Sequence, residues 1–211
     1  TFIGLGSNLL IRDGGVKGTV IIMHGGLTEI NINNNYFYAE AGVSCSKLAK
    51  FVAKNSFINS AFLAGIPGTI GGALAMNAGC YGYEIWDFVS NVLVINEEGK
   101  QFKRDKNEYI AQYRKVSNKQ KLNEYFLAAW MNFPRGIKED AERDIRLLLK
   151  NRKESQPLNW PTAGSTFRNP QNNFAAKLIE ECGLKGFTIG GAQISKKHAN
   201  FIINLGNASA F

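Results

Sequence analysis

The sequence predicts an α+β fold, and two features carry this prediction. Short runs rich in β-branched and aromatic residues alternate with turn residues in the first part of the chain, as at 18–23 and 36–42. Two longer segments, 44–56 and 136–152, instead repeat their apolar residues at helical spacing. A chain that mixes such strand runs with amphipathic helices is typical of the α+β class.

The predicted strands are short and end in turns. Phe2-Ile3 opens the first, and the Asn-Asn-Asn run at 33–35 predicts a hairpin between TEINI and YFYAEAG. The segment 89–105 predicts a second hairpin, with Glu98-Gly99 in its turn. EYFLAAWMNF at 124–133 predicts one further strand.

Three helices are predicted from the spacing of apolar residues. The first places Leu48, Ala49 and Val52 on one face, with Ser44 or Ser46 as its N-cap. The second has an apolar face formed by Ile137, Ala141, Ile145 and Leu148. The third aligns Phe174, Leu178 and Cys182 and ends at Gly183, a residue typical of a helix C-terminus.

The character of the chain changes near Pro134. The strand-rich part precedes this residue and the long charged helix follows it. The sequence therefore predicts a β-rich α+β domain over residues 1–134 and a smaller α+β domain over residues 135–211.

Composition narrows the class of protein. The chain has 211 residues, 45% hydrophobic and 20% charged, with a net charge of +8. Such an excess of positive charge suits an anionic partner, which could be a nucleic acid, a phosphorylated metabolite or a membrane surface. A basic surface that is only solvated by water would have the same composition. Nucleic-acid motifs and membrane-length apolar runs are lacking, so neither nucleic acid nor membrane is expected as a partner.

Cysteine and histidine usage limits the chemistry. Cys45, Cys80 and Cys182 form no Cys-x-x-Cys pair, which favours a reducing, cytoplasmic location over a disulfide scaffold. His24 and His198 are too few for a zinc site, so no metal is expected.

Two glycine-rich segments are the candidates for a binding site. GLGSNLLIRDGG at 4–15 follows a strand but does not match the dinucleotide fingerprint, and no phosphate-binding P-loop motif occurs. AFLAGIPGTIGGALAMNAGCYG at 61–82 is uncharged, and Thr69 is placed to cap a helix there. The amides of that helix would face a pyrophosphate. A tight, glycine-packed turn is the alternative interpretation of the same residues.

Two further motifs follow these segments along the chain, YR at 113–114 and AGSTFRNP at 163–170. In these four motifs and in their order, the sequence resembles the UDP-N-acetylenolpyruvoylglucosamine reductase (MurB) family of peptidoglycan synthesis. The similarity runs over nearly the whole chain and favours the branch without an inserted tyrosine loop. It implies non-covalent FAD in a domain of the vanillyl-alcohol-oxidase/p-cresol-methylhydroxylase type, followed by a substrate-binding domain. It assigns the FAD diphosphate to two walls, Gly4, Gly6, Ser7, Asn8 and Leu9 in one, and Gly65, Ile66, Pro67, Gly68, Gly71, Gly72, Asn77 and Gly79 in the other.

The resemblance also implies a reaction in two halves. NADPH reduces FAD, and the flavin then gives hydride to C3 of the enolpyruvyl group of UDP-N-acetylglucosamine enolpyruvate. Arg114 matches the catalytic arginine that stabilises the developing enolate, and Ser165 matches the donor of the proton to C2. Asn169 and Arg152 are the expected substrate contacts. Spacing alone leaves Arg114 as a surface arginine and Ser165 as a turn serine.

Relative to the family, the sequence departs at both ends. An initial segment that completes the flavin domain is expected before Thr1, and a catalytic glutamate is expected beyond Phe211. Two alternatives therefore stay open. One is a different flavoenzyme of the same domain type, and the other is a truncated, non-catalytic protein that binds flavin or nucleotide.

Overall fold

The computed structural model describes all residues from 1 to 211, and these divide into two compact units. The first comprises Thr1–Leu5 and Val20–Leu149, and the second comprises Gly6–Thr19 and Lys150–Phe211. Both contain helices and mainly antiparallel strands, which confirms the α+β class. Relative to a division at residue 134, residues 6–19 belong to the second unit and residues 135–149 to the first. The boundary at residue 134 between functional domains therefore stays a prediction.

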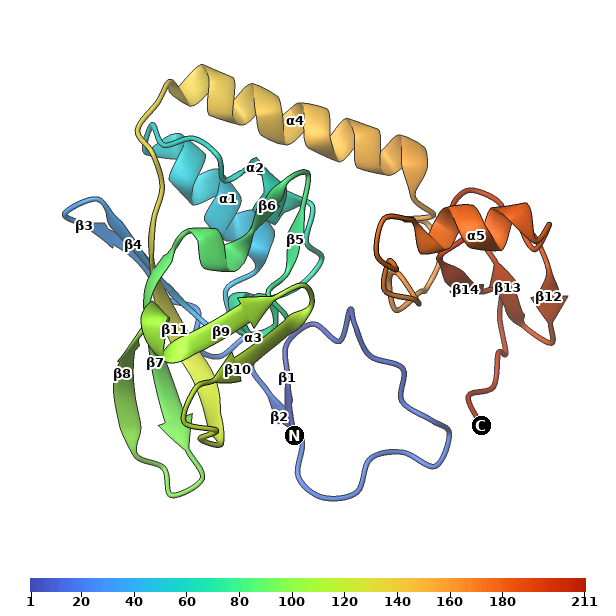
Figure 1. Cartoon of the computed structure of the whole chain (residues 1–211), viewed down its shortest axis with the longest axis horizontal. Coiled ribbons are helices and arrows are strands. Elements are labelled where there is room, and N and C mark those ends of the chain that lie inside the picture. Colours follow the sequence, from blue (N-terminus) through green and yellow to red (C-terminus); the bar gives the residue numbers. More distant parts are fainter. The chain divides into compact units, whose positions relative to one another are not determined.

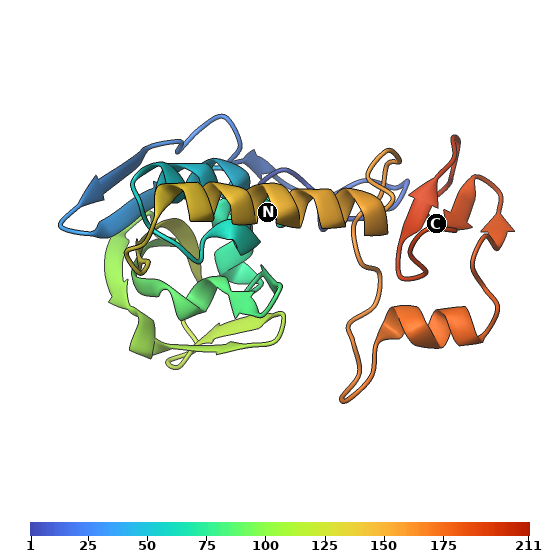
Figure 2. The same ribbon diagram turned by 90° about the horizontal axis from the view of Figure 1, so that it is seen from above.

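The first unit is built on a five-stranded antiparallel sheet of order β3-β4-β11-β7-β8. Helices α1, α2 and α3 lie on one side of it (Figures 1 and 2). The strands of the unit are β1 (Phe2–Ile3), β2 (Ile21–Ile22), β3 (Ile30–Asn33), β4 (Tyr36–Glu40), β5 (Gly79–Cys80), β6 (Tyr83–Glu84), β7 (Val89–Asn96), β8 (Gln101–Asp105), β9 (Tyr109–Gln112), β10 (Lys115–Asn118) and β11 (Glu124–Asn132). The helices are α1 (Cys45–Lys54), α2 (Ala61–Ala64), α3 (Ile70–Ala75) and the short 3-10 turns η1 (Ile85–Asp87) and η2 (Lys106–Glu108).

Alternation along the strands decides which face of the sheet is buried. Phe37 in β4, Val92 in β7 and Met131 in β11 are fully buried on the helix side. Phe37 meets Phe57 edge to face at 4.8 Å between ring centroids and Phe133 at 5.6 Å. This aromatic cluster forms the centre of the core, because buried aromatic side chains contribute the largest apolar areas.

Local sequence signals explain how the first elements begin and turn. Asn34 and Asn35 both have positive φ, at 48° and 67°, in the two-residue loop between β3 and β4. Asparagine tolerates this left-handed conformation, which the tight hairpin requires. The Ser44 side chain accepts a hydrogen bond from the Lys47 amide at 3.3 Å, so the N-cap of α1 is Ser44 and not Ser46.

Helix α4 (Lys138–Ser155) confirms the long charged helix and corrects its apolar face. Ala141, Ile145 and Leu148 are buried as predicted. Ile137 lies before the helix and is 61% exposed, so it does not belong to the face. The prediction for Ile137 was wrong because the helix begins one residue later, at Lys138.

The second unit contains α5 (Ala175–Glu181) and a three-stranded sheet of β12 (Thr188–Ile189), β13 (Ala192–Ile194) and β14 (Ile202–Asn204). Figure 2 shows α5 to one side of these strands. Gly183 ends the helix as predicted, with φ of 70° and its amide donating to Glu180. The predicted apolar row of α5 is not buried, since Phe174 and Leu178 are 66% and 40% exposed.

None of the helices described here combines the length and the apolar character that a bilayer crossing requires.

Candidate functional site

The second glycine-rich segment folds as α2, a turn and α3, followed by the β5–β6 pair. Thr69 occupies the N-cap position of α3, as predicted, but its side chain makes no capping hydrogen bond. Its hydroxyl oxygen is buried and has no hydrogen-bond partner within the chain. Leaving a buried polar group unsatisfied costs about 1–3 kcal/mol, so this hydroxyl marks a place where a ligand atom would be stabilising.

The backbone amides of this segment differ from the sequence-based expectation. Ile70 and Gly71, the first residues of α3, donate their N–H groups to the carbonyls of Val43 and Ala41, at 2.8 and 2.9 Å. The amides of Gly65, Ile66 and Gly68 also donate to backbone carbonyls of the chain. The first turn of α3 therefore does not present all of its amides to a ligand, because those of Ile70 and Gly71 already donate to the backbone of residues 41–43.

Several glycines of the segment are explained instead by close packing within the protein. A Cβ on Gly71 would lie 2.9 Å from the Cβ of Ala41, and one on Gly65 would lie 2.9 Å from Cys80 Sγ. A Cβ on Gly4, in the first glycine-rich segment, would overlap Thr69 Oγ1. The two segments therefore touch at Gly4 and Thr69, as two walls of one site would.

The residues around this contact fit an anionic, acceptor-rich group such as the FAD diphosphate. The Thr69 hydroxyl is a donor without a partner, and no carboxylate occurs between residues 61 and 83 to repel an anion. Gly72 and Pro67 are exposed beside it, whereas Ile66 packs partly against the core. Assignment of all these residues to FAD stays a prediction.

Arg114 lies at the tip of the hairpin formed by β9 and β10. Gln112 and Lys115 pair directly, so Tyr113 and Arg114 form a two-residue loop. Arg114 has φ of 55°, a left-handed backbone conformation that residues other than glycine, asparagine and aspartate rarely adopt. Such strain is concentrated at functional sites, where surrounding structure holds the residue in place.

The surrounding contacts of Arg114 come from the end of the second glycine-rich segment. Its guanidinium donates from Nη1 to the Asn77 carbonyl at 3.1 Å and from Nη2 to the Gly79 carbonyl at 2.7 Å. The structure thus brings three predicted site residues together. Asn77 and Gly79, predicted for FAD, anchor the predicted catalytic arginine through their backbone.

In the second unit, the first glycine-rich segment approaches the AGSTFRNP motif. Gly6 has φ of 70°, and its carbonyl accepts from the Leu9 amide at 3.2 Å, which makes a tight turn with Asn8 and Leu9 exposed. A Cβ on Gly164 would lie 3.6 Å from the Ser7 carbonyl oxygen. Ser7 therefore lies beside the residue that precedes Ser165.

Ser165 is exposed. Asn200 holds the loop that contains it, residues 163–170, which we call the serine loop. The Thr166 amide donates to the Asn200 carbonyl at 2.9 Å, and the Phe167 amide donates to Asn200 Oδ1 at the same distance. Asn200 Nδ2 returns a hydrogen bond to the Phe167 carbonyl at 2.8 Å. These bonds fix the backbone of the serine loop without using the serine hydroxyl.

The two predicted substrate contacts also lie in the second unit. Asn169 accepts at Oδ1 from the Ala175 amide at 3.1 Å, which ties the motif to the start of α5. Arg152, in the last turn of α4, donates from Nε to Gln156 Oε1 at 2.8 Å. Their roles in substrate binding stay predictions.

The serine loop carries a pH-sensitive contact. His198 Nδ1 accepts from the Asn200 amide at 3.3 Å, and its ring meets Phe201 edge to face at 4.8 Å. Burial lowers the pKa of His198 below its ordinary value of 6.5, and the positive charge of Lys185 adds to this effect. A backbone hydrogen bond and the charge of Glu180 oppose it. The folded protein thus favours a neutral ring, which the acceptor role at Nδ1 also requires.

We therefore expect acidification to destabilise the fold through His198. Above about pH 6.5 the ring is neutral in both the folded and unfolded states. As the pH falls from there towards the lower folded pKa, the unfolded state binds the proton first and the stability decreases. Melting temperatures measured from pH 7.5 to 5 should fall more steeply for the wild type than for His198→Gln, and parallel curves would contradict this.

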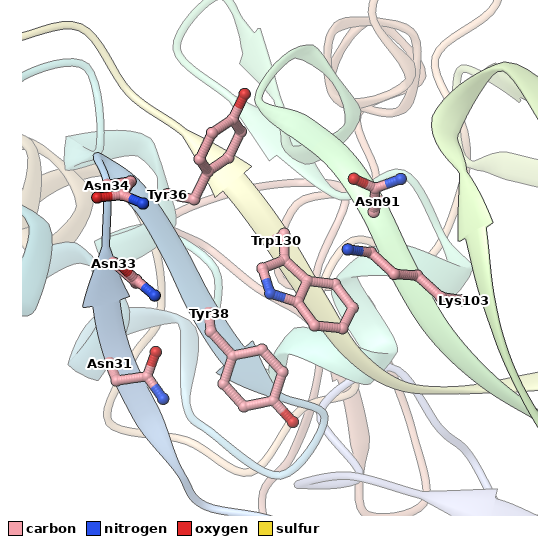
Figure 3. Close-up of a pocket in the computed structure, with 8 residues that line it drawn as sticks. All are labelled: Asn31, Asn33, Asn34, Tyr36, Tyr38, Asn91, Lys103 and Trp130. Atoms are coloured by element: carbon pink, nitrogen blue, oxygen red, sulfur yellow. The ribbon is translucent and has the colours of Figure 1, made fainter.

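A pocket of about 290 Å³ lies elsewhere, on the outer face of the five-stranded sheet (Figure 3). Tyr38 and Trp130 are adjacent there, with 5.1 Å between ring centroids, and Lys103 Nζ lies 4.5 Å from the Trp130 centroid. The lining residues are Asn31, Asn33, Asn34, Tyr36, Tyr38, Asn91, Lys103 and Trp130. None is a predicted site residue, so the candidate site remains the one built on the glycine-rich segments.

Two supporting residues did not emerge from the sequence. Asn200, 4% exposed, holds the serine loop, and the half-buried Glu84 contacts Asn77. A signal for Glu84 does exist, since it is the first charged residue after the uncharged stretch from 61 to 83. Asn200 is a polar residue just before the apolar run FII, but this pattern alone does not indicate which backbone groups it binds.

Comparisons with known proteins indicate the family of the chain. Residues 1–104 match the model of an FAD binding domain, and residues 156–211 match that of the UDP-N-acetylenolpyruvoylglucosamine reductase C-terminal domain. The UDP-N-acetylenolpyruvoylglucosamine reductases of Thiobacillus denitrificans and Nitrosococcus oceani are 49% and 51% identical to the chain. Each alignment covers 99% of this chain, and 68% and 70% of the relative.

A solved structure is similar as well. The crystal structure of UDP-N-acetylenolpyruvylglucosamine reductase (MurB) from Thermus caldophilus matches with a TM-score of 0.87 and 33% identity. The match covers 100% of this chain and 76% of that one. Among the curated relatives, the chain spans between 66% and 72% of their length. On these matches, the chain belongs to the UDP-N-acetylenolpyruvoylglucosamine reductase (MurB) family.

Proposed function

We propose that the protein is an FAD-dependent oxidoreductase that reduces UDP-N-acetylglucosamine enolpyruvate to UDP-N-acetylmuramate, a step of peptidoglycan precursor synthesis. One observation carries the proposal beyond family membership. Arg114 is fixed in a strained conformation by the carbonyls of Asn77 and Gly79, within the segment that the family resemblance assigns to FAD. The arginine is thereby held beside the segment that we propose binds FAD.

Arg114 supplies the electrostatic part of the reaction. Reduction of an enol ether by hydride develops negative charge on the substrate, and a planar guanidinium suits the carboxylate on which that charge is shared. Because the hydrogen bonds to two carbonyls fix the guanidinium before substrate arrives, little reorganisation is needed during the reaction. FAD bound at the site would supply the hydride once NADPH has reduced it.

Ser165 supplies the proton. The carbon that becomes C2 of the lactyl group must be protonated, and the exposed hydroxyl of Ser165, which matches the family's proton donor, is the group proposed to protonate it. Asn200 fixes the loop through the Thr166 amide and through the amide and carbonyl of Phe167. A fixed backbone limits the hydroxyl to the few positions that serine rotamers allow, and general acid catalysis requires the proton donor to lie within hydrogen-bond reach.

The remaining assignments concern the substrate and the reductant. Arg152 and Asn169 are proposed to contact the UDP-sugar, and the net charge of +8 favours such an anionic ligand. NADPH is the proposed co-substrate that reduces the flavin. A cytoplasmic location is proposed, because an odd number of cysteines without a Cys-x-x-Cys pair favours a reducing setting. A non-catalytic flavin-binding protein is not favoured, because the reductase relatives match over 99% of the chain.

The function is tested by following both halves of the reaction with the FAD-loaded protein. NADPH should bleach the flavin absorbance, and UDP-N-acetylglucosamine enolpyruvate should restore it under anaerobic conditions. Formation of UDP-N-acetylmuramate would be verified by mass spectrometry. Flavin that is reduced by NADPH but is reoxidised only by oxygen, with and without the enolpyruvyl compound, would contradict the proposal.

The Thr69 hydroxyl gives a separate test of the FAD site. Thr69→Val removes a buried donor that the chain itself leaves unsatisfied, so the flavin-free protein should be as stable as the wild type or more stable. A hydrogen bond to a charged group contributes about 1.5–3 kcal/mol, so FAD affinity should fall by about 10- to 100-fold. Fluorescence titration with FAD and thermal melts of the flavin-free protein measure the two effects. Unchanged FAD affinity would remove Thr69 from the site.

A further inference from the structure

Glu84 is a carboxylate that accepts hydrogen bonds from two groups of the chain. It is half-buried in β6, and its Oε2 accepts from Asn77 Nδ2 at 2.5 Å. Its side chain also accepts from the Asp87 amide, and the Asp87 carboxylate accepts in return from the Glu84 amide at 2.8 Å. A half-buried charge with such defined partners is held in one orientation.

Asn77 connects this carboxylate to the hairpin of Arg114. Its Nδ2 donates to Glu84 and also to the Gln112 carbonyl at 3.2 Å, two residues before Arg114. Its Oδ1 accepts from the Trp86 amide at 3.4 Å. The side chain is 1% exposed, so each of these polar groups depends on a partner inside the protein.

The same residue holds the guanidinium directly. Asn77 has φ of 39°, and in this conformation its backbone carbonyl accepts from Arg114 Nη1. Glu84 thus fixes the Asn77 side chain. Asn77 in turn holds the Arg114 hairpin at two points, the Gln112 carbonyl through its Nδ2 and the Arg114 guanidinium through its own carbonyl. We infer that Glu84 is a positioning residue for Arg114 and acts through Asn77. This inference rests on the proposed function of Arg114.

The alternative is that Glu84 only stabilises the β5–β6 pair, in which it lies opposite Gly79. The two roles predict different kinetics. A positioning residue affects the half-reaction in which Arg114 acts on the substrate, whereas loss of a purely structural residue lowers stability and slows both half-reactions together.

The test compares Glu84→Ala and Glu84→Gln with the wild type, all loaded with FAD. Small misplacement of a catalytic group costs up to about 100-fold in rate, so Glu84→Ala should slow flavin reoxidation by the enolpyruvyl substrate by about 10- to 100-fold. Reduction of the flavin by NADPH should be unchanged. Glu84→Gln should recover most of the rate, because its amide oxygen still accepts from Asn77 Nδ2. Glu98→Gln is the matched control, since Glu98 is exposed and pairs only with Lys100 in a surface ion pair.

A double variant isolates the connection to Arg114. In the Arg114→Ala background, Glu84→Ala should cause no further slowing of reoxidation, because the group that Glu84 positions is already missing. Additive losses, or equal slowing of both half-reactions with a lower melting temperature, would overturn the inference. If Glu84→Ala does not fold, Glu84→Asp takes its place in the comparison with Glu84→Gln and the wild type.

Failure of this inference can be told apart from failure of the proposed function. If Arg114→Ala reoxidises as fast as the wild type, the proposed role of Arg114 is wrong and the role of Glu84 falls with it. If Arg114→Ala is slow while Glu84→Ala equals the wild type, the positioning role alone is wrong.

Discussion

Replacing Ser165 by alanine is expected to slow flavin reoxidation by the enolpyruvyl substrate by about 10²- to 10⁴-fold, the usual contribution of a general acid. Reduction of the flavin by NADPH should remain unchanged, because no proton is delivered to substrate carbon in that half. The loop should keep its shape, since the Thr166 and Phe167 amides bind Asn200 without help from the serine hydroxyl. Anaerobic stopped-flow absorbance measures the two halves separately.

Ser155→Ala is the matched control for Ser165→Ala. Ser155 is an exposed serine of the same unit, and its hydroxyl donates to the Asn151 carbonyl within α4. This variant should retain both rates. Equal losses in both half-reactions of Ser165→Ala would show that the substitution disturbs flavin or fold, and would remove Ser165 from the role of proton donor.

Features governed by neighbouring residues were predictable from the sequence. The tight turn at Asn34 and Asn35 follows from the tolerance of asparagine for positive φ, and the end of α5 at Gly183 follows from that of glycine. The N-cap of α1 was narrowed to two serines, and the geometry selects Ser44. Each of these depends on a few bonds within one segment, which the sequence specifies directly.

Features that depend on what lies against a segment were less predictable. The periodicity of α5 indicates which side of the helix is apolar, yet Phe174 and Leu178 on that side are exposed. Ile137 shows a related error, because extending a periodic pattern by one position included a residue that precedes α4. Periodicity reports the direction of a side chain but not the presence of a partner.

The glycine-rich segment shows the same distinction at the site. Glycine indicates that something approaches the backbone closely. The sequence left two interpretations of that approach open, a ligand or a tight, glycine-packed turn. At Gly71 it is Ala41 and at Gly65 it is Cys80 that approach. The family motif identified Arg114 and Asn77, but the bond between them comes from residues 37 positions apart and required the fold.

Replacing Arg114 by glycine should separate the stability of the hairpin from its function. Arg114 holds φ of 55° at the second loop position, where glycine is favoured, and a side chain in that region costs about 1–3 kcal/mol. Glycine relieves this strain but loses the hydrogen bonds to Asn77 and Gly79. We expect the melting temperature of Arg114→Gly to equal or exceed that of Arg114→Ala, which keeps the strain and loses the same bonds.

The rate of flavin reoxidation should rank these variants differently from their melting temperatures. Loss of a preorganised group that stabilises developing negative charge costs about 10²- to 10³-fold in rate, so Arg114→Gly and Arg114→Ala should both reoxidise the flavin slowly by that factor. Arg114→Lys keeps the charge but not the planar fork, and should be intermediate. If the glycine variant is both stable and as fast as the wild type, the strain at this position has no catalytic purpose. If it is stable and slow, the chain retains an arginine in a strained conformation because that conformation aims the guanidinium, and turn geometry alone does not explain the residue.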